Sequence, residues 1–371
     1  MSHLKHSDVI RSVYSKFEIA KSSGALFFYP STRSKATEHG FNFEITICPA
    51  LQKKPLLPAP DFAKVDKPDP FAPPYVLDLY IGDLKDELEG DEYAILLNKF
   101  SVVPGHFLMV TKGFQPQNSP LTPPELTQAY LLIRASQKSK SPIFAFYNCG
   151  ADSGASQSHK HIQFLPTTTE ETDEDEDEDD LRPPVEAYVQ GLKIGDDTKL
   201  FSLPLPYAHF VQRLHLPKTT VSGAKPLSEE ALEELSGKLT GAFLNLLDQA
   251  LQSIRLYHSS QSTTTGPTEA IQAAVPSYNI ILTSEHMHLI PRLREETLEE
   301  LHPEAAKTPE TDGAAYNPQK LSVNSLGFAG MLMAKSDAEA EAIKAKGVIE
   351  LLSQVGVPNI EDKTNDAPES A

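Results

Sequence analysis

The spacing of apolar residues predicts two amphipathic helices, and a capping signal predicts a third. Apolar side chains recur three and four residues apart over residues 7–23 and over the longer stretch 228–256. This is the spacing of one buried helical face. Thr122, with Glu125 three residues later, forms a capping box for a helix that runs to about Ser136.

Further segments have the pattern of strands. Strict alternation of apolar and polar residues predicts a half-buried strand, and short apolar runs bounded by turn residues predict buried ones. Pro104-Gly105 supplies the turn of one β-pair, and one buried strand ends at Asn148. The predicted strands are 41–47, 93–97, 107–111, 143–147, 277–283 and 286–292.

Polar and proline-rich stretches separate these elements. Prolines dominate residues 49–74, which predicts a long loop of the kind that is usually functional or disordered. Ten of the eleven residues in 170–180 are acidic, and such a block repels itself, so we predict a solvated loop. We place the boundary between an N-terminal half, 1–180, and a C-terminal half, 181–371, at this block. The polar tail from about residue 360 is predicted to be disordered.

Composition narrows the choice of compartment and partner. The formal charge of −18 on 371 residues argues against a nucleic-acid or membrane partner. Cys48 and Cys149 are the only cysteines, which excludes a disulfide framework and a four-cysteine zinc site. The polar N-terminus has no apolar run typical of a signal peptide, and no stretch approaches a membrane span. We therefore predict a cytoplasmic protein, with the nucleus as a second compartment.

The candidate chemistry follows the strand that ends at Asn148. A turn of small residues, Ser153–Gln157, comes next, and small residues let backbone N–H groups approach a phosphate closely. His159, His161 and Gln163 then alternate along the chain. Residues i, i+2 and i+4 of a strand share one face, so two imidazoles and one amide project together while the residues between them turn to the core.

Three uses of this motif are open. The turn can be an ordinary connection, and His-x-His is also a spacing found among metal ligands. No cysteine lies downstream, however, and no carboxylate pair with matching spacing is evident. Covalent nucleotidyl transfer fits better. An imidazole nitrogen attacks phosphorus near neutral pH when its other nitrogen is held by an acceptor and donors surround the phosphate.

The motif resembles the histidine-triad superfamily, in the transferase branch that carries His-x-His-x-Gln. Hydrolases of that superfamily usually carry a third histidine where this chain has Gln163. Within the branch, the chain resembles the fungal-type ATP adenylyltransferases, also called diadenosine tetraphosphate phosphorylases, over roughly residues 10–357 without the acidic block. The matching segments are 91–93, 97–100, 103–107, Asn148, 154–157, 159–165, 277–279, 290–292 and 323–330.

The resemblance implies a role for each site residue. His161 would be the nucleophile that takes AMP, His159 would orient it and buffer charge, and Gln163 would hold the transferred phosphate and disfavour attack by water. Lys53 or Lys54, on the proline-rich loop, would reach the distal phosphates. Other contacts would form a phosphate cradle, an adenosine or ribose region, and a second phosphate or base region. The cradle comprises Asn148, Gly154, Ala155, Ser156 and Gln157; the adenosine region comprises Asn98 and Lys99; the second region comprises Asn279, Met287 and Arg292. Ser153, Ser277 and Tyr278 would also bind substrate.

Patterns and resemblance together imply an α+β fold with two lobes, histidine-triad-like, in which helices pack on the outer face of a mostly antiparallel sheet. The implied enzyme converts diadenosine tetraphosphate and phosphate to ADP and ATP, reversibly, through an AMP–His161 intermediate. A divalent cation such as Mg²⁺ is expected to accompany the polyphosphate, with no metal ion bound by the protein itself. A hexose-1-phosphate uridylyltransferase and a non-catalytic nucleotide sensor are the alternatives. The expected partners are the dinucleotide, ATP, ADP and phosphate, bound by a monomer.

Overall fold

The computed structural model describes residues 3–50, 69–137, 139, 142–167, 182–221, 226–261, 276–298, 301 and 320–359. Three predictions from the sequence lie outside these residues. They concern Lys53 and Lys54, the acidic loop 170–180 and the tail from residue 360.

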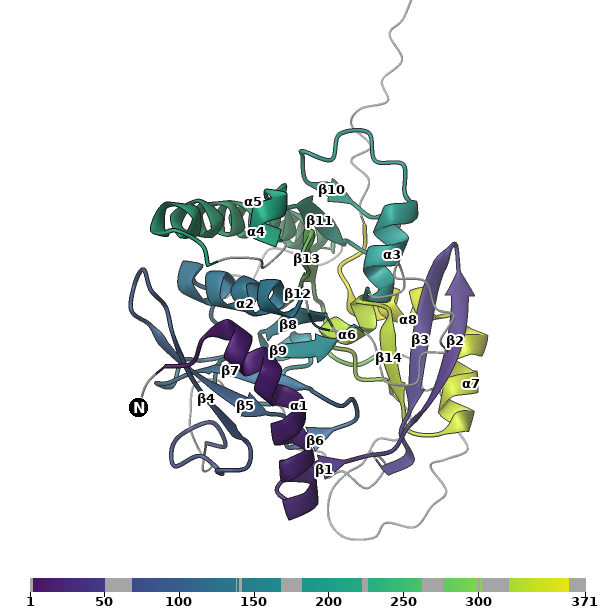
Figure 1. Ribbon diagram of the computed structural model, residues 1–371. Coiled ribbons are helices and arrows are strands. Elements are labelled where there is room, and N and C mark those ends of the chain that lie inside the picture. The colour runs from purple at the N-terminus through teal and green to yellow at the C-terminus, as the bar shows by residue number, and fades with distance from the viewer. Residues whose placement is uncertain are drawn as a thin grey trace, which may run out of the picture.

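A nine-stranded sheet forms the centre of the molecule (Figure 1). Its strand order is β10-β11-β13-β12-β8-β9-β7-β5-β4, and neighbouring strands pair antiparallel throughout. Strands from both halves of the sequence share this sheet, because β12 pairs with β8. The strands are β4 (Tyr80–Lys85), β5 (Glu92–Leu97), β7 (Phe107–Thr111), β8 (Ile143–Cys149), β9 (His161–Pro166), β10 (Phe201–Ser202), β11 (Phe210–Arg213), β12 (Tyr278–Leu282) and β13 (His286–Pro291).

Two smaller sheets accompany the large one. In the first, β14 (Met331–Ala334) pairs parallel with β3 (Phe41–Ile47), and β3 pairs antiparallel with β2 (Thr32–Glu38). In the second, β1 (Phe27–Phe28) pairs parallel with β6 (Phe100–Ser101). The predicted strand at 41–47 is confirmed, but its parallel neighbour lies almost 300 residues away in sequence, so local pattern alone does not identify the pair.

The helices divide between the two faces of the large sheet. Helices α1 (His6–Ser23), α2 (Pro123–Ser136) and α5 (Glu229–Gln261) pack on one face (Figure 1). On the other side α3 (Pro184–Gly191), α6 (Ser325–Phe328), α7 (Asp337–Lys346) and α8 (Val348–Val355) pack with the three-stranded sheet. The short α4 (Lys218–Val221) precedes α5. The three predicted helices are confirmed, including the capping box between Thr122 and Glu125.

Alternation along the central strands assigns side chains to two cores. Ile162 and Phe164 of β9 lie in the core beneath α1, α2 and α5, as the sequence predicted. Leu165 of β9 and Phe146 of β8 lie in the second core, with α3, α7 and α8. His161 and Gln163 share the face of Leu165, so the candidate site opens on the side away from the long helices.

None of the helices in the described residues is both long and apolar enough to span a membrane.

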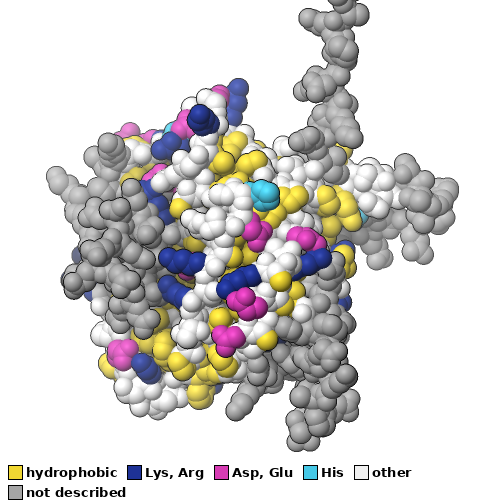
Figure 2. Space-filling view, turned by 90° about the vertical axis from the view of Figure 1, so that its right-hand side faces the viewer, with side chains coloured by type: hydrophobic (Ala, Val, Ile, Leu, Met, Phe, Trp, Pro, Cys, Tyr) yellow, Lys and Arg dark blue, Asp and Glu magenta, His cyan; other side chains and the backbone are white. Residues whose placement is uncertain are grey.

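Figure 2 shows the face over β2, β3 and α7, where basic side chains lie among acidic ones. Arg33 of β2, for example, lies 3.9 Å from Glu44 of β3.

Candidate active site

The geometry of His161 is that of a neutral nucleophile. Its Nδ1 lies 2.8 Å from the carbonyl oxygen of His159 and donates to it, which leaves the lone pair on Nε2. Nε2 has no hydrogen-bond partner among the described residues. Burial lowers the pKa of His161 to about 4, while the hydrogen bond to His159 opposes this shift. The ring is therefore uncharged at neutral pH, with Nε2 able to attack.

This pKa predicts a rate that is insensitive to pH near neutrality. The folded-state pKa is about 4, below the ordinary value of about 6.5, so the nucleophilic form is complete above roughly pH 5 and is lost as pH falls through 4. We expect the single-turnover rate of AMP transfer to be flat from about pH 5.5 to 8. A rate that halves near pH 6.5 would show that His161 titrates like an exposed histidine.

Acid should also destabilise the fold, because other histidines are buried in the neutral form. Burial lowers the pKa of His6, His106, His209 and His288 as well. The unfolded chain takes up these protons near pH 6.5, so stability is complete above that value and declines as pH falls towards 4. Circular dichroism must therefore accompany the pH–rate measurement, to separate loss of the nucleophile from loss of the fold.

His159 is held by a carboxylate that the sequence did not reveal. Its Nδ1 lies 2.6 Å from Asp69 Oδ2, and its Nε2 lies 2.9 Å from the carbonyl oxygen of Thr111. Asp69 also accepts the backbone N–H of Phe71, whose ring centre lies 5.0 Å from that of His161. Asp69 holds the ring of His159, and the carbonyl oxygen of His159 orients His161. Asp69 therefore stabilises the position of the nucleophile indirectly, through His159. Asp69 is separated from His159 by 90 residues, and no local pattern singles it out.

Gln163 is oriented by a second buried histidine. His106 Nε2 lies 3.1 Å from Gln163 Oε1 and donates to it, because an amide oxygen can only accept. Burial lowers the pKa of His106 to about 4, so the ring is neutral. The amide N–H groups of Gln163 are then left for a ligand. Asn98 contacts His106 and accepts the backbone N–H of Phe100. Its side chain is thus partly engaged within the protein, and its predicted adenosine contact stays a prediction.

Lys99 follows Asn98 in the sequence, and its side chain is exposed. Its ammonium is 5.8 Å from the ring centre of Phe27 and 5.6 Å from that of Phe100. The two rings stack with their centres 5.7 Å apart. The predicted contact of Lys99 with adenosine stays a prediction.

Gln117 is the main site residue that sequence analysis missed. Its Oε1 accepts the backbone N–H of His161 over 2.7 Å, and its Nε2 donates to the carbonyl oxygen of Asn148 over 2.8 Å. The side chain is fully buried and links β8 to the start of β9, holding nucleophile and Asn148 side by side. It lies between prolines in a polar loop, where nothing marks one glutamine as special.

Replacing Gln117 should destabilise the protein and the site together. Gln117→Met keeps the length of the side chain but leaves buried backbone groups of His161 and Asn148 without partners. We expect unfolding free energy to fall by about 3 kcal/mol and kcat to fall with it. Gln137→Met is the matched control, because Gln137 makes one long bond, 3.4 Å, at the end of α2. Equal stability of the two variants in urea denaturation would contradict this role.

The glycine–serine turn is shaped by close contacts with distant segments. Gly150 and Gly154 have φ of +91° and +78°, and a Cβ on Gly154 would lie 2.7 Å from the carbonyl oxygen of Val323. The Ser153 hydroxyl donates to the carbonyl of Gly150, and the Ser277 hydroxyl accepts the backbone N–H of Asp152. These hydroxyls therefore help to build the turn, and the predicted substrate contacts of Ser153 and Ser277 stay predictions.

The remaining turn residues differ in exposure. Ala155 is buried, Ser156 is exposed and Gln157 is half-buried. The side chains of Ser156 and Gln157 make no hydrogen bond within the described part of the chain. Their predicted phosphate contacts stay predictions.

Two predicted contacts lie on the wrong face of the sheet. Tyr278 and Met287 are buried in the core beneath the long helices, opposite the face of His161. Tyr278 is one position out of phase with Asn279, which does face the site, because neighbouring strand residues point to opposite sides. The prediction of substrate contact by these side chains is therefore corrected. Asn148, Asn279 and Arg292 lie on the site face, joined by hydrogen bonds.

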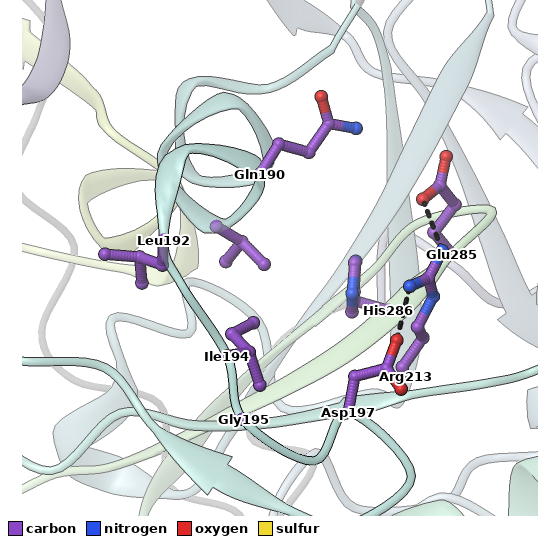
Figure 3. Close-up of a pocket in the computed structure, with 9 residues that line it drawn as sticks. Gln190, Leu192, Ile194, Gly195, Asp197, Arg213, Glu285 and His286 are labelled. Atoms are coloured by element: carbon purple, nitrogen blue, oxygen red, sulfur yellow. Dashed lines mark hydrogen bonds and ion pairs between the residues drawn. The ribbon is translucent and has the colours of Figure 1, made fainter.

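A separate cavity of about 590 Å³ lies beside β11 and β13 and the end of α3 (Figure 3). Arg213, at its wall, pairs with Asp197 at 2.6 Å and Glu285 at 3.9 Å. His286, also in the wall, donates to buried Glu186. The cavity lies at β13, three strands away from β9, and the charge of Arg213 in its wall is neutralised by Asp197 and Glu285. It is therefore not the site of the His161 chemistry.

Known protein families match both halves of the chain. Residues 1–179 match the Ap4A phosphorylase N-terminal domain, and residues 203–358 match the ATP adenylyltransferase C-terminal domain. The chain is 29% identical over 360 residues to diadenosine 5',5'''-P1,P4-tetraphosphate phosphorylase 2 of Saccharomyces cerevisiae, covering 94% of each protein. It is 26% identical over 368 residues to Protein APA1 of the same yeast, covering 95% of each.

Solved structures give the same result. The crystal structure of yeast Ap4A phosphorylase Apa2 with AMP matches with a TM-score of 0.64 and 25% identity, over 98% of this chain and 100% of that one. The complex with Ap4A matches with a TM-score of 0.64 and 26% identity, over 94% and 97%. With both domains matched in order and relatives matched along nearly their whole length, the chain belongs to the Ap4A phosphorylase/ATP adenylyltransferase family.

Proposed function

We propose that this protein is a nucleotidyltransferase that cleaves diadenosine tetraphosphate (Ap4A) with inorganic phosphate to ADP and ATP, reversibly. The observation that carries the proposal is the state of His161. Its Nδ1 is committed to the carbonyl of His159, and its neutral Nε2 is free on the face that also carries Gln163 and Asn148. This is the arrangement that in-line attack on a phosphoryl group requires.

The reaction then has two balanced half-reactions. His161 Nε2 attacks the phosphorus of one AMP unit; a P–N bond forms, the P–O bond to the next phosphate breaks, and ATP leaves. Phosphate attacks the same phosphorus; a P–O bond forms, the P–N bond breaks, and ADP leaves with neutral His161 restored. The N–H groups of Gln163 and Asn148 would stabilise the charge that develops on the non-bridging oxygens.

The substrate is proposed to be the magnesium complex of the dinucleotide. The four linked phosphates are negatively charged, and the protein itself has a formal net charge of −18. A cation bound with the substrate would reduce the repulsion between them. In the residues that the structure describes, no group of three or more His, Cys, Asp or Glu is arranged to hold a metal ion. The proposed place of the cation is the polyphosphate, whose negative charge it would offset. The other proposed partners are ATP, ADP and phosphate; the proposed state is a monomer in the cytoplasm, with the nucleus as a second compartment.

One experiment separates this function from its alternatives. Purified protein is incubated with Ap4A and Mg²⁺, with and without phosphate, and in parallel with a UDP-sugar and hexose 1-phosphate. We expect ADP and ATP in equal amounts, only when phosphate is present. Uridylyl exchange with the sugars would instead identify a hexose-1-phosphate uridylyltransferase. Binding of Ap4A without any product would identify a sensor.

A further inference from the structure

Asn148, Asn279 and Arg292 form one buried chain of hydrogen bonds across the sheet. Asn148 on β8 lies directly opposite Asn279 on β12, and Arg292 follows β13. Their exposed fractions are 2%, 0% and 3%. Arg292 Nη1 donates to Asn279 Oδ1 over 2.5 Å, and Asn279 Nδ2 donates to Asn148 Oδ1 over 2.8 Å.

The orientation of both asparagine amides in these hydrogen bonds is determined by neighbouring groups that can only donate or only accept. A guanidinium can only donate, so the atom of Asn279 that it contacts must be the oxygen. Asn279 Nδ2 also lies 2.9 Å from the carbonyl oxygen of Ser153, which can only accept. The backbone N–H of Ser325 donates to Asn148 Oδ1 over 2.9 Å, so this atom is also an oxygen. Neither amide can be reversed without several unfavourable contacts.

Asn148 therefore presents its two N–H donors on the side away from Asn279. Its Nδ2 makes no hydrogen bond to any described residue. The strand on that side is β9, and Gln117 ties the backbone of Asn148 to that of His161. The free donors thus lie next to the nucleophile.

Arg292 places a positive charge at one end of the hydrogen-bonded series Arg292–Asn279–Asn148. Within the described residues its hydrogen bonds go only to uncharged oxygens: the amide of Asn279 and the backbone carbonyls of Ser153, Arg294, Glu295 and Val355. Burial lowers its pKa to about 9, so it is still charged at neutral pH. A cation in a poorly polarisable interior strengthens the amide hydrogen bonds that lead away from it.

We propose that Arg292 and Asn279 are positioning residues, not substrate contacts: they lock the amide of Asn148 with its N–H donors turned to the phosphoryl group that His161 attacks. This inference rests on the proposed function and revises the roles that the family resemblance implied for both residues. A reversed Asn148 would offer an oxygen to an anionic phosphate. The lock excludes that state before substrate arrives.

Asn279→Asp tests the lock with almost no change of shape. The aspartate still accepts from Arg292 but cannot donate to Asn148. We expect kcat for ATP release from Ap4A to fall about 100-fold, the usual effect of losing one transition-state donor, while KM changes less than about threefold. Asn148→Ala should cost a similar factor, and the double variant no more than Asn148→Ala alone. Losses that multiply would mean that Asn279 acts on the substrate directly and would overturn the proposal.

Further variants guard against misfolding. Ser325→Ala removes a 2.6 Å bond to Asn148 Oδ1 without adding charge; we expect a loss of about fivefold in kcat, again absorbed by Asn148→Ala. Asn245→Asp, on α5, is the matched control for the amide-to-carboxylate change and should behave as wild type. Arg292→Lys keeps a cation and a donor, so it should retain more kcat than Arg292→Met. Equal losses would overturn the part played by the charge.

A binding measurement separates this inference from the proposed function. In protein labelled with ¹⁵N-asparagine, the side-chain NH₂ signal of Asn148, assigned with Asn148→Ala, should shift on adding AMP but not adenosine. The shift should disappear in Asn279→Asp. A wild-type protein that shows this response yet makes no ADP and ATP would contradict the proposed function alone. Turnover by wild type with an unmoved Asn148 signal would contradict the positioning role alone.

Discussion

His161→Ala is expected to abolish turnover of Ap4A while the protein still folds and binds nucleotide. Among the described residues, no other side chain places a neutral imidazole nitrogen where His161 Nε2 lies, so no other group can form the bond to AMP. Loss of a nucleophile normally costs four or more orders of magnitude in kcat, and we expect a fall of at least about 10⁴-fold. His161 contributes little to folding, because its ring makes a single hydrogen bond, to the backbone of His159.

The measurement is ATP release from Ap4A, with AMP binding and thermal unfolding as checks on the variant. His258→Ala, at an exposed position late in α5, is the control for loss of one histidine. Labelled adenylate should become acid-labile and protein-bound in wild type and not in His161→Ala. Retention of more than about a hundredth of wild-type activity would show that the covalent mechanism is wrong.

Gln163→His is expected to turn part of the phosphorylase reaction into hydrolysis. Water must lose a proton when it attacks the AMP–His161 intermediate, whereas phosphate is already ionised near neutral pH. The amide of Gln163 cannot take that proton, but a histidine can. We expect slower formation of ADP and ATP, and AMP release by water raised about 100-fold, the lower end of the usual gain from general acid–base catalysis.

The structure adds a partner that shapes this prediction. His106 Nε2 faces position 163, and as a neutral imidazole it can accept the N–H of a histidine placed there, which leaves the lone pair of the other nitrogen of that histidine towards the substrate. Gln163→Met is the control: it removes the donors without adding a base, so it should slow both products and leave the AMP share unchanged. Product partition is measured by chromatography at fixed phosphate. The same AMP share in Gln163→His and wild type would place acceptor choice elsewhere, in the Gly154–Gln157 turn or the lysine loop.

The sequence determined the parts of this protein that depend on neighbours in the chain. Helical spacing located α1 and α5, and the capping box located the start of α2, because backbone hydrogen bonds in a helix join residues four apart. Strand alternation placed His161 and Gln163 on one face and Ile162 and Phe164 on the other. Tyr278 and Met287, which the resemblance had grouped with the site, are excluded from that face only by the observed register of β12 and β13 in the sheet.

Only the tertiary structure decided which residues support the chemistry and which are left to touch substrate. Asp69 reaches His159 across 90 residues, and Ser325 reaches Asn148 across 177. Contacts of this length arise from the strand order of the sheet, which no local periodicity encodes. Glu125 shows both levels: its bond to the Thr122 backbone follows from the capping box, whereas its 2.6 Å ion pair with buried Lys160, the residue before β9, exists only because α2 packs against β8, the neighbour of β9. The motif therefore pointed to the nucleophile that we propose, whereas only the packing shows the hydrogen bonds that join Arg292 and Asn279 to Asn148.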